Sequence, residues 1–145
     1  MSRTWYSHPP EDDTDGVLLR DHLHDVADRV KAVVPADATT STGASLREVG
    51  RVAALVHDFG KLTTWFQHHI GMGGEPPEYD QQRHHALFGG FLAYYALDAQ
   101  GFETETCLAG FVAVAKHHGR LSNVAEYIFD RAHGQDGSDE KYHAV

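Results

Sequence analysis

The residues with the clearest potential for chemistry are histidines that adjoin an aspartate or another histidine. His57 precedes Asp58, and two more pairs follow, His84-His85 and His117-His118. Neutral imidazole and ionised carboxylate are common ligands for divalent transition metals, and a carboxylate can bridge two ions. Two ions about 3.5 to 4 Å apart can hold both the attacking and the leaving oxygen of a phosphoryl group. The pairs therefore indicate a two-metal centre and phosphoester hydrolysis.

Chance pairing is the alternative explanation, because the chain has twelve histidines among 145 residues. Any one of these histidines could be a hydrogen-bonded core residue or a surface residue. However, His57, His85 and His118 each fall on or at the end of a segment with an apolar helical stripe, where a polar residue needs a reason. Together the pairs favour the metal centre.

Composition predicts one soluble domain over residues 1–145, with 130–145 as a flexible tail. The chain is 41% hydrophobic, enough for a substantial core. Its single cysteine, Cys107, lies among apolar residues, which excludes a disulfide framework. No signal sequence opens the chain and no apolar run reaches the roughly 20 residues that span a membrane, so we expect a cytoplasmic protein.

The net charge argues against a broad basic surface for nucleic acid. It is −9, and Asp is the main acid while lysine is scarce. Phosphate binding normally depends on Lys and Arg, so affinity for a nucleic acid would come mainly from metal ions or a partner. The same excess of Asp over Lys is typical of a surface adapted to high salt.

Two N-terminal helices are expected to position the first histidines. One covers residues 17–34, capped by Asp15, with His22 facing the core and His24 facing water. The other starts after a Ser45 cap and delivers the His57-Asp58 pair at its C-terminal end.

The segment after Asp58 is expected to turn back toward this pair. Gly60 would break or bend the helix and let Lys61 return to the site, before a short helical stretch over 62–67. We interpret His68 and His69 as surface residues, because a Gly- and Pro-rich loop follows at once.

Two further helices complete the expected all-α fold, a compact bundle of five to six helices. One starts near Arg83, with His84 about 100° around the axis from His85. Its predicted inner face contains His85, Phe88, Gly89, Leu92 and Ala96. The other runs from Glu103 to His118 with Gly119 as its C-cap, and a sixth could cover 121–129. No strand pattern competes.

These motifs resemble the HD superfamily of metal-dependent phosphohydrolases. Three of them are similar to the HD nuclease of type I CRISPR interference, which occurs fused to or beside a helicase. They are Tyr6-Ser7-His8-Pro9, His57-Asp58-Phe59-Gly60-Lys61 with Phe66-Gln67, and Lys116-His117-His118-Gly119-Arg120-Leu121. The resemblance covers about residues 6–121 and implies an HD-domain helical bundle.

The resemblance also implies roles for individual residues. His22 and His57 would contact one ion, Asp58 would bridge both, and Lys61 would contact a substrate phosphate or an oxygen held by a metal. His85, His117 and His118 would hold the second ion, since His85 fits the family spacing better than His84. Ser7 and His8 belong to the N-terminal motif and could order the rim of the site.

One departure concerns a further aspartate that family members usually supply downstream. This chain ends at Val145, so the resemblance predicts that the helix carrying it is missing. Asp130, Asp136 or Asp139 could substitute. A poorly held metal would leave the domain weakly active or inactive.

The implied function is cleavage of single-stranded DNA as an endonuclease, with additional exonuclease cleavage left open, and with a helicase and an RNA-guided surveillance complex as partners. The ligand set favours Mn, Fe, Co or Ni, with Mg less suited. Trp5, Tyr6 and Trp65 are candidates to stack a base. Two rivals remain: an HD phosphohydrolase of nucleotides, and a metal-binding interaction module without catalysis.

Overall fold

The computed structural model describes residues 4–12, 14–74, 76, 78 and 85–119. Within these residues the protein is mainly helical, as predicted, with five α-helices, one 3₁₀ turn and a two-stranded sheet. The elements are β1 (Tyr6–His8), β2 (Val17–Leu18), α1 (Leu19–Val33), α2 (Leu46–Val56), η1 (Phe59–Leu62), α3 (Thr64–His69), α4 (Ala86–Asp98) and α5 (Thr104–Ala115).

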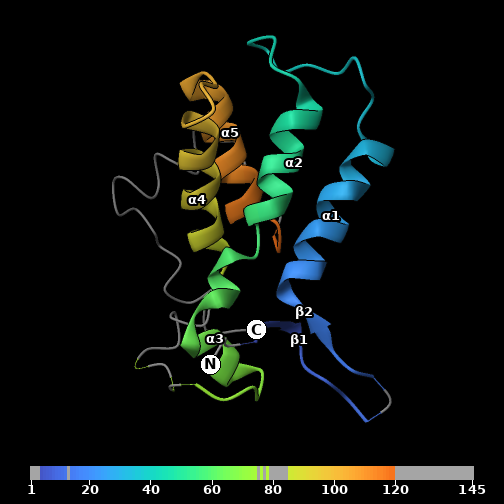
Figure 1. Ribbon diagram of the computed structural model, residues 1–145. Coiled ribbons are helices and arrows are strands. Elements are labelled where there is room, and N and C mark those ends of the chain that lie inside the picture. The colour runs from blue at the N-terminus through green and yellow to red at the C-terminus, as the bar shows by residue number, and fades with distance from the viewer. Residues whose placement is uncertain (1–3, 13, 75, 77, 79–84, 120–145) are drawn as a thin grey trace.

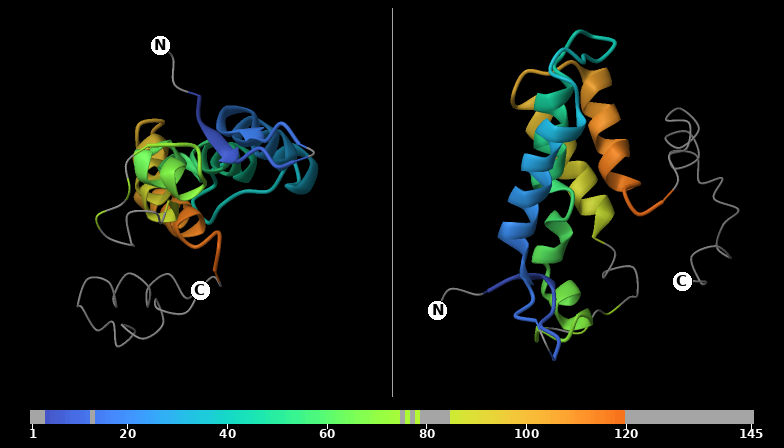
Figure 2. Two further views of the ribbon diagram at one scale, coloured as in Figure 1. Left: turned by 90° about the horizontal axis from the view of Figure 1, so that it is seen from below. Right: turned by 90° about the vertical axis from the view of Figure 1, so that its right-hand side faces the viewer.

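The four longer helices form an elongated array, with α3 and the small sheet at one end (Figures 1 and 2). Helix α1 packs on α2, α4 packs on α5, and α2 joins the two pairs by contacting both α4 and α5. Val49 and Val52 of α2 meet Leu97 of α4 and the free Cys107 of α5 in an apolar cluster. This cluster fixes the helices relative to one another. No helix in the described part of the chain has the length and apolar character needed to cross a bilayer.

The start of the second helix agrees with its sequence, whereas the start of the first differs. The Ser45 hydroxyl accepts the N–H of Glu48 at 3.4 Å, which is the predicted N-cap of α2. The predicted Asp15 cap of α1 is wrong, because Val17 and Leu18 pair with β1 and the helix begins only at Leu19. A strand of two residues is too short to produce a recognisable alternation.

The predicted inner face of helix α4 is confirmed at Gly89, which is buried, and is wrong at Phe88. Phe88 is 45% exposed, and Phe91 and Tyr95 extend the same exposed apolar stripe. The buried residues are Gly89, Gly90, Ala93 and Leu97. Because the helix is apolar on nearly all sides, its periodicity could not identify the inner face.

Helix α5 ends earlier than predicted. It stops at Ala115, and Lys116 occupies the C-cap position in place of Gly119. His117 and His118 therefore lie in a turn, where the N–H of His117 bonds the Val114 carbonyl at 3.2 Å. The predictions for His84, for a helix over 121–129 and for a flexible tail over 130–145 lie outside the described residues.

Candidate metal centre

The candidate site lies at the end of the array where α2 and α5 finish and α1 and α4 begin. Asp58, which is only 2% exposed, occupies its centre between α2 and η1. His22 comes from the first turns of α1, His57 follows α2, and His85 precedes α4. Since each histidine is at or near a helix end, the packing of the helices determines the site's geometry.

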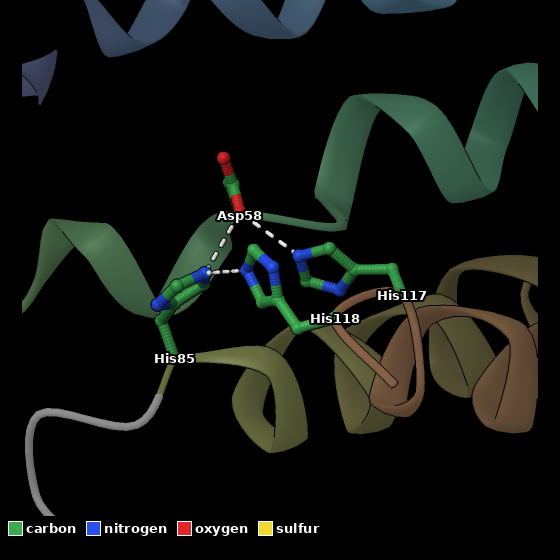
Figure 3. A group of neighbouring side chains, drawn as sticks. All are labelled: Asp58, His85, His117 and His118. Atoms are coloured by element: carbon green, nitrogen blue, oxygen red, sulfur yellow. Dashed lines mark hydrogen bonds and ion pairs between the residues drawn. The ribbon is translucent and has the colours of Figure 1, made fainter. Parts of the chain in front are cut away.

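The two carboxylate oxygens of Asp58 face different imidazoles. Oδ2 lies 3.2 Å from Nε2 of His22 and 3.4 Å from Nε2 of His57. Oδ1 lies 3.1 Å from Nε2 of His85 and 3.3 Å from Nε2 of His117 (Figure 3). Such a carboxylate is suited to bridging two ions.

The ligand atoms therefore form two groups that share Asp58. The first group is His22, His57 and Asp58, and the second is Asp58, His85, His117 and His118. In each group the candidate ligand atoms lie within 4.8 Å of one another. Nε2 of His22 is 3.3 Å from Nε2 of His57, and Nε2 of His85 is 2.8 Å from Nε2 of His118. Each group could hold a metal ion.

The same backbone contact orients one histidine in each group. Nδ1 of His57 bonds the Ala54 carbonyl at 2.8 Å, and Nδ1 of His117 bonds the Val114 carbonyl at 2.6 Å. A carbonyl only accepts, so Nδ1 carries the proton and Nε2 of the neutral ring presents a lone pair. Both carbonyls belong to the last turn of a helix, where the usual acceptance of an N–H four residues further on is lost and a side chain can be accepted. The helix ends thus prepare both rings as ligands.

Two buried atoms of the second group have no hydrogen-bond partner among the residues that the structure describes. They are Oδ1 of Asp58 and Nε2 of His117, 3.3 Å apart. When the ring is neutral both atoms are acceptors, and leaving both desolvated is costly. A cation bound by both would remove that cost, so these residues fit a metal.

The protonation states also suit metal binding. Burial alone would raise the pKa of Asp58, but the imidazoles of His117, His57 and His85 that face its oxygens, together with the Lys61 ammonium, hold the pKa well below its ordinary range. Burial, with the neighbouring His117 and His85, lowers the pKa of His118 to about 4. Burial also lowers the pKa of His22. A carboxylate beside neutral imidazoles is the form that binds a metal without first releasing protons.

Burial opposes the charge on His57 as well, but its hydrogen bonds to Asp58 and the Ala54 carbonyl outweigh that effect and raise its pKa. The first group therefore contains a ring that holds a proton more readily than free histidine does.

Lys61 is 6% exposed, and its Nζ lies 2.8 Å from Oδ2 of Asp58. The ammonium thus neutralises the carboxylate from the side of the first group. Its expected contact with substrate stays a prediction.

The remaining predicted residues lie outside the two groups. His8 is exposed on β1, with its ring centroid 5.7 Å from that of His22, and belongs to neither group. His24, His68 and His69 are exposed, as predicted. His84, Asp130, Asp136 and Asp139 are not among the described residues.

Sequence reasoning missed how closely two glycines approach the histidines. A Cβ on Gly89 would come 2.3 Å from the His57 carbonyl oxygen, and one on Gly60 would come 2.5 Å from Cα of His85. These contacts bring α4 directly against the end of α2, and so bring His85 to Asp58. Gly60 belongs to the His57–Lys61 motif and could have indicated this close approach to His85. From the sequence alone we interpreted it as a bend in the helix.

The protein is thus a helical domain in which two groups of histidines share Asp58, and this His/Asp site is compatible with metal binding. The family described as "Cas3, HD domain" matches residues 7–143, and the chain belongs to this family, as the resemblance predicted. It is similar to the CRISPR-associated nuclease/helicase Cas3 of Haloferax volcanii, with 38% identity over 76 residues. That match covers 52% of this chain and 8% of the relative, which is therefore much longer. No solved structure gives a significant match.

Proposed function

We propose that this chain is a metal-dependent deoxyribonuclease of CRISPR type I interference that hydrolyses phosphodiester bonds of single-stranded DNA, both internally and from an end. The observation that carries the proposal is the placement of Asp58, whose two oxygens face separate sets of imidazoles. A carboxylate so placed can serve two ions at once. This arrangement suits phosphodiester chemistry, in which attacking and leaving oxygens both need stabilisation.

The first and second groups would hold one divalent ion each, with Asp58 as the shared ligand. Bound ions there would supply Lewis acidity that activates water and offsets charge on the phosphate. The predominance of imidazole favours Mn, Fe, Co or Ni, with Mg possible but less suited. Around the ions, His57 and His117 present fixed Nε2 atoms and Lys61 holds the carboxylate.

The DNA would be brought to the site by partners. With a net charge of −9, the chain has little means to attract a polyanion. A helicase, fused or separate, would supply single strands, and an RNA-guided surveillance complex would supply specificity. The similarity to a relative named as nuclease/helicase supports this. Trp5, Tyr6 and Trp65, all half-buried, are candidates to stack a base.

The decisive experiment is cleavage of circular single-stranded DNA at high potassium chloride, with manganese or with EDTA. Circular DNA has no ends, so only an endonuclease can linearise it. We expect manganese-dependent cleavage that Asp58→Ala abolishes and that His24→Ala, on the exposed side of α1, retains. Cleavage that persists in Asp58→Ala would overturn the proposal.

Two other outcomes would identify the rivals. Hydrolysis of mononucleotides with intact DNA would indicate an HD phosphohydrolase of nucleotides. Tight manganese binding without turnover on any phosphoester would indicate an interaction module.

A further inference from the structure

A second buried polar network adjoins the histidines, and two of its residues, Ser7 and Gln67, have no role in the proposed function. It contains Ser7 of β1, Lys61 of η1 and Gln67 of α3, which are 3%, 6% and 1% exposed. Nζ of Lys61 bonds Oγ of Ser7 at 3.1 Å and lies 3.5 Å from the Ser7 carbonyl oxygen. The same Nζ bonds Oδ2 of Asp58 at 2.8 Å. Lys61 therefore links the N-terminal strand to the centre of the site.

Gln67 holds that strand in place. Its Nε2 donates to the Tyr6 carbonyl at 2.8 Å and to the Lys61 carbonyl at 2.9 Å, and its Oε1 accepts the Tyr6 N–H at 3.2 Å. One side-chain amide thus joins β1 to η1. The arrangement requires two donor hydrogens and one acceptor, which an amide provides and a carboxylate does not.

We propose that Ser7 and Gln67 are positioning residues that set the orientation of Asp58 through Lys61. Gln67 fixes β1 against η1, and the fixed Ser7 then holds the Lys61 ammonium on Oδ2. With Oδ2 held from that side, Oδ1 points to His85 and His117. The inference rests on the metal binding of the proposed function.

A substitution that removes a few atoms tests the contacts that lead from Ser7 through Lys61 to Asp58. Ser7→Ala removes the hydroxyl that holds Lys61, the outer partner of Asp58. Disturbing such a partner should weaken Mn²⁺ binding about tenfold. Mn²⁺ titration of the apoprotein, followed by the electron paramagnetic resonance spectrum, measures this without any activity assay. Ser45→Ala is the matched control: it removes the N-cap of α2, so it should lower Tm and leave Mn²⁺ affinity unchanged.

A double-mutant cycle separates positioning from general stability. If Ser7 acts through Lys61, Ser7→Ala should add nothing to the effect of Lys61→Met on Mn²⁺ affinity. Gln67→Glu, which keeps the shape but removes both donors, should give a tenfold loss that Lys61→Met likewise masks. Additive losses in the cycle, or wild-type Mn²⁺ affinity in Ser7→Ala, would overturn the inference.

A failure of the proposed function can be distinguished from a failure of this inference. If Asp58→Ala binds Mn²⁺ as the wild type does, the site itself is wrong. If only the Ser7 cycle fails, the metal site stands and the positioning role is wrong.

Discussion

The first and second groups share Asp58 but differ in what surrounds its two oxygens. In the first group, Oδ2 faces two imidazoles and already bonds the Lys61 ammonium at 2.8 Å. In the second group, Oδ1 has no hydrogen-bond partner within the described part of the chain, and three imidazoles surround it. The ammonium orients the carboxylate, but it also occupies Oδ2 and repels a cation beside that oxygen, whereas an unpartnered oxygen attracts one. The two groups therefore differ in their expected affinity for a metal ion although they share one carboxylate. We expect the second group to bind its ion more tightly.

The largest expected effect is removal of the charge that the groups share. Asp58→Asn should abolish tight binding of both ions and lower DNA cleavage on the order of a thousandfold or more, since Asp58 is the only anionic ligand of either group among the described residues. Manganese stoichiometry by paramagnetic resonance, together with the cleavage rate, measures this. One ion retained at wild-type affinity would mean that the groups do not share Asp58.

Removal of one imidazole from each group tests the predicted difference directly. His118→Ala should weaken the tighter ion and His22→Ala the weaker one, each by about tenfold or more, because loss of a ligand should cost at least what loss of an outer partner costs. Two-step Mn²⁺ titrations resolve the two affinities. If His22→Ala instead removed the tighter ion, the predicted order of the groups would be reversed.

Gly89 of α4 lies directly against the backbone of His57, and this contact places the second group beside the first. One added methyl group should break it. Gly89→Ala would put a Cβ 2.3 Å from the His57 carbonyl oxygen. The overpacking should lower the free energy of unfolding by about 1–3 kcal/mol and reduce Mn²⁺ affinity in the second group. Thermal unfolding of the apoprotein measures the first effect.

Gly50→Ala is the control for this substitution. Its Cβ would meet only side-chain atoms of Val30, the nearest at 3.1 Å, and a small shift relieves that contact. Equal losses of stability in the two variants would show that the close approach at Gly89 has no special importance.

The smallest expected effect is an opposite response of His118 and His57 to acid. In the folded apoprotein the pKa of His118 is lowered from 6.5 to about 4, so its protonation favours the unfolded chain and stability falls between those pH values. The pKa of His57 is raised, so protonation of His57 favours the folded chain as pH falls toward 6.5.

Thermal unfolding in EDTA at pH 7 and pH 5 tests these signs. Relative to the wild type, His118→Ala should lose less stability on acidification and His57→Ala should lose more. Identical responses of both variants would contradict the assigned shifts.

Much of this arrangement could be predicted from the sequence, because helix ends are local features. The Ser45 cap and the apolar stripes placed His57 and Asp58 at the end of a helix, and the structure brings the predicted histidines into the two groups. Their roles as ligands stay predictions. The fold class and the family are confirmed.

The features that could not be predicted from the sequence depend on contacts between distant segments. The exposure of Phe88 followed from which side of α4 meets α5, and an almost wholly apolar helix does not encode that choice. The end of α5 at Ala115 and the burial of Lys61 beside Ser7 likewise depend on packing around Asp58. Propensity and periodicity describe single segments, so they cannot supply such contacts.

The way the chain supplies its histidines has a consequence for the order of folding. His22 and His57 are 35 residues apart, and His85 and His118 are 33 residues apart, so no single helix or turn contains either group. Closing such loops is entropically costly and comes after the local helices form. The centre is thus a late product of folding. During synthesis, its second half can close only after residue 118 has left the ribosome.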